Sequence, residues 1–214
     1  MVTSILIVED HDLVRTGLKN ILSAEPGFKI IGETSTGEEA IRLARDLEPD
    51  VILMDVELPG LSGLETTERI LKVQSRVRVV VLTAHSEPPL PARLLDIGAS
   101  GYLTKACSAR ELVNAVKAVA RGERYIGSEI AQQLALSLLP GTPQSPFQEL
   151  TARELEVALM LTQGMKPPSI AEVIKVSPKT VATHKYNIYE KVGVSSEVEL
   201  LRLALRYGLV KPEP

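Results

Sequence analysis

Five polar side chains in the first half of the chain follow directly after short apolar runs that have the composition of strands. Glu9 and Asp10 follow residues 5–8, Asp55 follows residues 51–54, Thr83 follows residues 77–82, and Lys105 comes just after residues 101–103. In a doubly wound parallel sheet, ligands bind beyond the carboxyl ends of the strands, where the strand order reverses. We therefore expect these side chains to meet at one edge of a sheet.

The three carboxylates of this set would repel one another. Each pair about 4 Å apart costs on the order of a few kcal/mol at an effective dielectric near 20. Such a cluster favours a hard divalent cation, and oxygen ligands with room for water suit Mg²⁺. The predicted metal ligands are Glu9, Asp10 and Asp55.

With the metal in place, one carboxylate can act as a nucleophile toward a phosphoryl group. Asp55 is the predicted nucleophile, because the third strand lies between the metal ligands on the first strand and Thr83 on the fourth. The hydroxyl of Thr83 and the ammonium of Lys105 suit the phosphoryl oxygens. Taken singly, an acidic pair can be a helix-start feature and a lysine after a strand is usually solvated. Matching residues at four strand ends favour the functional interpretation.

An alternation of apolar runs and helix-period segments over residues 1–122 predicts the elements that carry these side chains. The predicted strands are 5–8, 28–31, 51–54, 77–82 and 101–103, and the predicted helices are 13–24, 38–47, 64–73, 91–97 and 111–121. The motifs Ser35-x-x-Glu38 and Ser108-x-x-Glu111 have the form of capping boxes. Five strand–helix units predict an α/β domain with a doubly wound, five-stranded parallel sheet of flavodoxin-like order 2-1-3-4-5.

A change of composition separates this region from the rest of the chain. A helical segment at 128–138 is followed by residues 140–146, which contain three prolines, one glycine and no charge, as in a linker. From residue 151 the patterns are helical throughout. We expect an α/β domain over 1–122, a connecting helix and proline-rich linker over 123–148, and an all-α domain over 149–214.

The all-α region contains a helix-turn-helix pattern. A helix capped by Thr151 and Glu154 precedes a short helix at 169–174, and Ser177 then caps a helix over 178–190 with Pro178 at its first position. Val181, Ile188 and Val192 form the apolar stripe of the last of these helices, and His184 is interpreted as a packing residue at its edge. The opposite face mixes groups that reach phosphates and base edges in a major groove. The predicted DNA contacts are Lys179, Thr180, Ala182, Thr183, Lys185 and Tyr186.

Composition sets the broad class. The chain of 214 residues is 44% hydrophobic and 24% charged, typical of a globular protein. Residues 1–149 have a net charge of −5 and residues 150–214 one of +2, a balance that permits DNA binding in the second region. The start of the chain has no signal-peptide pattern, and a single cysteine, Cys107, is compatible with a reducing compartment. We expect a cytoplasmic protein.

The motifs of the first half resemble the receiver domain of bacterial two-component response regulators. They are Val8-Glu9-Asp10-His11, residues 54–60 (MDVELPG), Leu82-Thr83-Ala84 and residues 101–105 (GYLTK). The resemblance covers residues 4–121. It implies Asp55 as phosphoacceptor, the backbone carbonyl of Glu57 as a further Mg²⁺ ligand, and Tyr102 as an aromatic switch whose ring turns inward when Thr83 engages phosphate. Glu9 replaces the commoner Asp, and Ala106 stands where many members have Pro.

Residues 149–208 resemble the LuxR-type helix-turn-helix, on the motifs 150–154 (LTARE), 177–184 (SPKTVATH) and 187–194 (NIYEKVGV). The chain is therefore similar to the NarL/FixJ class of response regulators. Its resemblance to the GacA/UvrY branch rests on residues 10–17 (DHDLVRTG), 124–126 (RYI), 130–136 (IAQQLAL) and 145–147 (SPF). Residues 165–168 (MKPP) depart from the commoner run before the second helix. The resemblance implies a phosphorylation-dependent transcription regulator, not an enzyme, with a sensor histidine kinase and double-stranded DNA as partners and a homodimer when phosphorylated.

Three alternatives remain at this point. A phosphatase of the haloacid-dehalogenase kind also uses Asp, Thr or Ser, Lys and Mg²⁺, but its nucleophile lies on the first strand. A flavodoxin-like electron carrier needs a phosphate cradle where this chain has two carboxylates. Neither explains residues 150–208. In the third alternative the C-terminal domain binds a protein, which the salt dependence of DNA affinity would distinguish.

Overall fold

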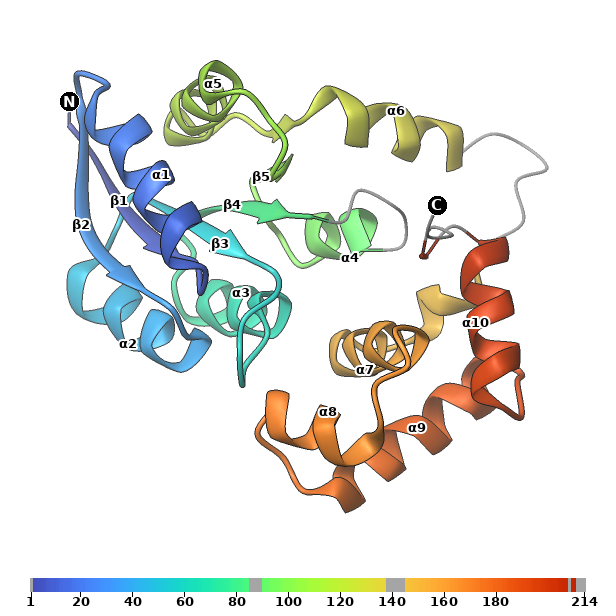
Figure 1. The fold of residues 1–214 in the computed structure, drawn as a ribbon. Coiled ribbons are helices and arrows are strands. Elements are labelled where there is room, and N and C mark those ends of the chain that lie inside the picture. Colours follow the sequence, from blue (N-terminus) through green and yellow to red (C-terminus); the bar gives the residue numbers. More distant parts are fainter. Residues whose placement is uncertain (1, 85–89, 138–144, 208, 211–214) are drawn as a thin grey trace.

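A computed structural model of the chain describes residues 2–84, 90–137, 145–207 and 209–210. It shows a twisted sheet with helices on both sides, and a group of helices that packs beside it (Figure 1). Residues 138–144, which include most of the predicted linker and the end of the predicted helix 128–138, lie outside the described residues.

The first part of the chain forms six parallel strands and six helices among the described residues. The strands are β1 (Thr3–Val8), β2 (Phe28–Thr34), β3 (Val51–Asp55), β4 (Arg78–Thr83), β5 (Gly101–Thr104) and β6 (Tyr125–Ile126). The helices are α1 (Asp12–Ser23), α2 (Gly37–Leu47), α3 (Gly63–Val73), α4 (Leu90–Asp96), α5 (Ala109–Ala120) and α6 (Ser128–Ser137).

The sheet has the order β2-β1-β3-β4-β5-β6, with every pair parallel. The predicted order 2-1-3-4-5 is confirmed, but the predicted count of five strands is wrong. Two residues of the segment predicted as a connection, Tyr125 and Ile126, pair with Gly101 and Tyr102 of β5. So short a strand gives no recognisable periodicity in the sequence, because alternation needs about four residues to be visible.

Alternate strand residues face two different cores. Ile5 and Ile7 point to the side covered by α1 and α5, where the cluster includes Leu22 and Val116. Leu6 and Val8 of the same strand point to the side covered by α2, α3 and α4. This second cluster continues without a break into the core of the C-terminal helices.

Close packing at the start of α3 requires glycine. A Cβ atom added to Gly63 would lie 1.7 Å from the carbonyl oxygen of Asp55, whereas real Cβ atoms essentially never come within 3.0 Å of another heavy atom. The N-terminus of α3 therefore lies directly against the end of β3. Ser62 caps α3 by accepting a hydrogen bond from the backbone N–H of Glu65.

Two capping boxes were predicted in the first half of the chain, and the structure has the serine cap of only one of them. Helix α2 has Thr36 as N-cap with no side-chain cap bond, so the predicted capping box of Ser35 and Glu38 is wrong. Ser108 does cap α5, accepting from the N–H of Glu111 at 3.1 Å.

The C-terminal region is helical, as predicted. A short 3₁₀ helix (Pro146–Glu149) precedes α7 (Ala152–Thr162), α8 (Pro167–Val173), α9 (Pro178–Val192) and α10 (Glu197–Arg206). The capping box of Thr151 and Glu154 is present in both directions. Helix α8 begins at Pro167, two residues before the predicted start, because Pro is well suited to the first helical position.

The C-terminal core confirms the predicted stripe of α9. Val181, Ile188 and Val192 are all buried there. His184 is half-buried, in agreement with its interpretation as a packing residue. Among the described residues, no helix is both long and apolar enough to span a membrane.

Candidate functional site

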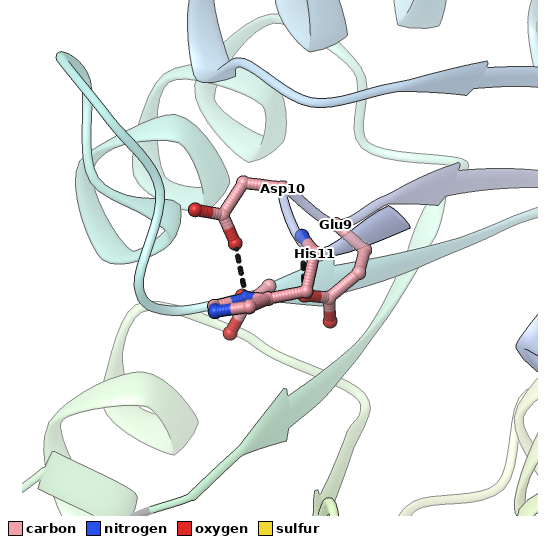
Figure 2. Close-up of side chains that lie close together, drawn as sticks. Glu9, Asp10 and His11 are labelled. Carbon is pink, nitrogen blue, oxygen red and sulfur yellow. Dashed lines mark hydrogen bonds and ion pairs between the residues drawn. The ribbon is translucent and has the colours of Figure 1, made fainter. Parts of the chain in front are cut away.

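The acidic residues predicted at the sheet edge come together at the ends of β1 and β3. Glu9, Asp10, His11 and Asp55 each offer a ligand atom, and these four atoms lie within 4.8 Å of one another. The side chains of Glu9, Asp10 and His11 are grouped just beyond the end of β1 (Figure 2). Glu9 and Asp55 are buried, Asp10 is partly exposed, and His11 is exposed.

Lys105 joins this cluster from the end of β5. Its ammonium nitrogen lies 2.8 Å from Oδ2 of Asp55 and 2.9 Å from Oε2 of Glu9. Oδ1 of Asp55 accepts a hydrogen bond from the backbone N–H of Glu57 at 3.2 Å. Thr83, at the end of β4, is fully buried. The sheet order thus places Asp55 between the acidic pair of β1 and Thr83 of β4, as the sequence predicted.

The electrostatics of the cluster favour an added positive charge. Burial raises the pKa of Asp55 above its usual range, the charge of Glu9 adds to this, and Lys105 opposes it. Hydrogen bonds to Asp55 and Glu9 raise the pKa of Lys105, although burial acts in the other direction. One ammonium therefore compensates two buried carboxylates. The carboxylate oxygens of Glu9, Asp10 and Asp55 form an oxygen-rich donor set, which fits a hard divalent cation.

His11 is a member of the cluster that the sequence reasoning missed. Its Nδ1 lies 2.7 Å from Asp10 Oδ1 and 3.2 Å from Glu9 Oε1. The negative charge of Asp10, followed by the hydrogen bond to Glu9, raises the pKa of the imidazole. Its position beside Asp10 in the sequence was the available signal.

Tyr102 is fully buried within β5. Its role as an aromatic switch stays a prediction.

The predicted DNA-contacting residues of α9 mostly face outward. Lys179, Thr180, Ala182 and Thr183 are exposed, and Tyr186 is 67% exposed. Lys185 differs, because its ammonium pairs with Glu197 of α10 at 2.6 Å and lies over the ring of Tyr189. The structure therefore groups five of the six on one accessible surface and directs the sixth toward a neighbouring helix.

The loop that follows Asp55 contacts the C-terminal helices directly. The N–H of Gly60 donates to the carbonyl of Val173 in α8 at 3.0 Å. Arg153 of α7 donates to the carbonyl of Gly60 at 3.1 Å and to that of Ile174 at 2.6 Å. We call these hydrogen bonds, together with the 2.7 Å ion pair of Arg153 and Glu156, the interdomain clasp. No local pattern in the sequence indicates the clasp.

Glu156 of α7 is mostly buried, pairs with Arg153 and lies near Glu65 of α3. Burial raises its pKa to about 7, the nearby Glu65 adds slightly, and Arg153 opposes the shift.

Comparisons with known proteins agree with this geometry. Residues 5–117 match the response regulator receiver domain family, and residues 148–204 match the luxR family of bacterial regulatory proteins. The response regulator GacA of Pseudomonas aeruginosa is 47% identical over 96% of this chain and 97% of its own length. The response regulator UvrY of Escherichia coli K12 is 44% identical over 98% and 97%.

Solved structures have the same architecture. The RcsB response regulator of Salmonella typhimurium matches over 99% of both chains with a TM-score of 0.75, and its 21% identity makes this a likeness of fold. A LuxR-family two-component response regulator from Aurantimonas is 34% identical, with a TM-score of 0.62 over 64% of this chain and 98% of its own. The chain belongs to the two-component response regulators, the phosphorylation-dependent DNA-binding regulators that join a receiver to a LuxR-type domain, in the group that includes GacA and UvrY.

Proposed function

We propose that Asp55 is the phosphoacceptor and takes its phosphoryl group from the phosphohistidine of a sensor kinase. The observation that carries this proposal is the position of Asp55: it is buried, it contacts Lys105 at 2.8 Å, and it lies beside Glu9 and Asp10. An Asp55 oxygen attacks phosphorus in line with the leaving imidazole nitrogen. The P–N bond breaks as the P–O bond forms, and the imidazole leaves with the electron pair.

The neighbouring side chains suit this transfer. Glu9, Asp10, Asp55 and the carbonyl of Glu57 would hold Mg²⁺, which screens the charge of the incoming phosphoryl oxygens. The ammonium of Lys105, which neutralises Asp55 in this structure, is within reach of a phosphoryl oxygen on the same carboxylate. The hydroxyl of Thr83 is the proposed donor to a second oxygen, next to the inward ring of Tyr102.

The test of the acceptor is phosphoryl transfer from acetyl phosphate, read by intact mass. Wild type should gain the mass of one phosphoryl group in the presence of Mg²⁺, and Asp55→Asn should gain none. The isosteric Asp50→Asn, at the other end of β3, serves as the control and should be labelled like wild type. Equal labelling of Asp55→Asn and wild type would place the acceptor elsewhere.

We propose further that the interdomain clasp restrains the DNA-binding domain until Asp55 is phosphorylated. Asp55, Glu57 and Gly60 lie on one short loop, so a phosphoryl group that draws the Asp55–Glu57 segment toward itself also pulls on the bond between Gly60 and α8. Within the clasp, the charged guanidinium of Arg153 donates one hydrogen bond across the domain boundary, to Gly60, and such a bond contributes about 1.5–3 kcal/mol. A shift of this size is enough to change which arrangement predominates.

The DNA-binding surface we propose consists of Lys179, Thr180, Ala182, Thr183, Lys185 and Tyr186, with Lys185 released from Glu197 on binding. Helix α10 leaves Val198, Leu201 and Leu205 exposed by 61%, 36% and 39%, a stripe that supports pairing of two such domains on a two-fold site. Phosphorylated wild type should bind operator DNA more tightly than Asp55→Asn. Equal affinities would contradict the switch. Affinity that does not respond to salt would favour a protein as the partner of this domain.

The remaining assignments are proposals of the same kind. The receiver is placed at residues 1–122, the connection at 123–148 and the DNA-binding domain at 149–214, with β6 of the connection completing the receiver sheet. The relatives are regulators, which supports a transcription factor acting in the cytoplasm over a phosphatase or an electron carrier.

A further inference from the structure

A cavity of about 290 Å³ lies between the receiver and the C-terminal domain, next to the clasp. Its receiver wall comes from the loop after Asp55, the start of α3 and the start of α4, and its opposite wall comes from α7. The apolar side chains that define it are Leu58, Leu64 and Leu90 on one side and Leu155, Leu159 and Met160 on the other.

The lining of the cavity combines buried leucines with a few acidic residues. Leu58, Leu64, Leu90 and Leu155 are each at most 4% exposed. Acidic groups occur among the remaining lining residues, namely Asp10, Glu57 and Glu156, of which Glu57 is exposed. An apolar cavity with a few polar groups at a domain interface has the make-up of a small-molecule site, and this volume is near the lower limit for one.

We infer that this cavity binds a small, mainly apolar molecule that is neutral or cationic and carries an N–H donor. Apolar rings fill the leucine-lined part, where burial of apolar surface contributes about 25 cal/mol per Å². The donor end faces the carboxylates. An anion of the same shape is disfavoured, because burial of an unpaired charge is costly and the lining residues include no lysine or arginine to pair with it. Arg153, outside the lining, is already paired with Glu156.

Such a ligand touches both domains at once. It therefore binds the closed arrangement, in which the two walls face each other, and not an arrangement in which they have separated. By linkage it shifts the population toward the closed arrangement. The inference that a ligand binds depends only on the cavity, whereas the effect of the ligand on DNA affinity rests on the proposed function of the clasp.

The test uses two fluorescent probes with the same aromatic framework, on the full-length unphosphorylated chain. N-phenyl-1-naphthylamine is neutral and has an N–H donor, and 8-anilino-1-naphthalenesulfonate adds a sulfonate. The neutral probe should give a saturable signal with one site per chain, and the sulfonate should bind roughly tenfold or more weakly. Absence of saturable binding of the neutral probe, or equal affinity for both probes, would overturn the inference.

Filling the cavity distinguishes this site from any other apolar surface. Met160→Trp and the milder Leu159→Phe should each weaken binding of the neutral probe by roughly tenfold. Leu13→Trp, on the exposed side of α1 where Leu13 is 86% exposed, is the control and should bind it like wild type. Thermal melting confirms that each variant is folded. Unchanged binding in both filling variants would contradict the site.

A second measurement separates the ligand site from the proposed switch. Saturating neutral probe should lower the DNA affinity of the unphosphorylated chain by a factor approaching 1 + [L]/Kd, and it should do so less in Met160→Trp. Probe binding with no change in DNA affinity would keep the site and contradict the clasp model. Absence of probe binding to an unphosphorylated chain that can still be phosphorylated at Asp55 would contradict the site and leave the phosphoacceptor intact.

Discussion

The two faces of the receiver sheet differ in what they pack against. The face under α1 and α5 has a core built from receiver residues, such as Leu22, Leu53 and Val116. The core on the face under α2, α3 and α4 continues into the C-terminal helices, so Met54 of β3 and Leu155 of α7 belong to one cluster. We call these the receiver-only face and the shared face.

The difference shows how a change at Asp55 can reach α9. Residues on the receiver-only face influence the stability of the receiver, because their packing neighbours lie within the receiver. The shared face bears the clasp, the cavity and the helix α3 that lies against the end of β3. A perturbation there acts on both domains together. Matched substitutions on the two faces test this difference.

The largest contrast is expected between two glycines. Gly63→Ala on the shared face drives a Cβ into the backbone oxygen of Asp55, where a Cβ would lie 1.7 Å away, and we expect a loss of about 3 kcal/mol or more in the free energy of unfolding. Gly17→Ala in α1 meets nothing within 4 Å and should stabilise by about 0.5–1 kcal/mol. Urea unfolding measures both. A neutral Gly63→Ala would show that α3 can move away from β3 at little cost.

The clasp should give the next largest effect. Arg153→Ala removes the hydrogen bonds to Gly60 and Ile174, and we expect the unphosphorylated chain to bind DNA roughly tenfold more tightly, the equivalent of about 1.4 kcal/mol. The control is Arg121→Ala at the end of α5, whose guanidinium pairs with Glu123 at the surface. Phosphorylated Arg153→Ala should match phosphorylated wild type. In wild type, phosphorylation is expected to raise DNA affinity. If phosphorylation raised the DNA affinity of Arg153→Ala by the same factor, the clasp would be ruled out as the restraint.

The shared face should also respond to pH through Glu156. Its pKa is about 7 in the closed arrangement and near the model-peptide value of about 4.3 once the carboxyl is solvated. Glu156 therefore binds a proton more tightly in the closed arrangement, and its protonation stabilises that arrangement. This stabilisation is fully present below the lower pKa and is lost as the pH rises through about 7.

The measurement is the DNA affinity of the unphosphorylated chain between pH 8 and pH 6. As the pH is lowered, the DNA affinity of wild type should fall relative to that of Glu156→Gln, by at most about tenfold per pH unit. Burial lowers the pKa of His184, followed by the effect of Arg153, and Glu154 and Glu65 oppose this. That titration is shared by both variants and cancels in their ratio. Parallel pH profiles would assign Glu156 no role in docking.

The smallest effect is expected on the outward side of α9, which neither face of the sheet covers. Lys179→Ala should weaken binding to all DNA sequences a few-fold and reduce the salt slope by about one. The loss should be the same in wild type and in Arg153→Ala, because distant, independent sites are additive. A loss that depends on the clasp would show that the shared face reaches the DNA surface itself.

Local sequence patterns were sufficient to predict the residues of the acidic site and the order of the sheet. Glu9, Asp55, Thr83 and Lys105 each follow an apolar run, and parallel topology brings the carboxyl ends of such runs to one edge. The capping of α7 by Thr151 and Glu154 and the buried stripe of α9 were likewise readable, because both depend on residues three to eleven positions apart.

Features that join distant segments became visible only in the tertiary structure. Strand β6 exists because Tyr125 and Ile126 find an open edge at β5, and the clasp joins Arg153 to Gly60 across 93 residues of sequence. Local patterns carry no record of such contacts, since they depend on how two separately folded surfaces fit together. The continuity of the shared core and the cavity beside it have the same origin.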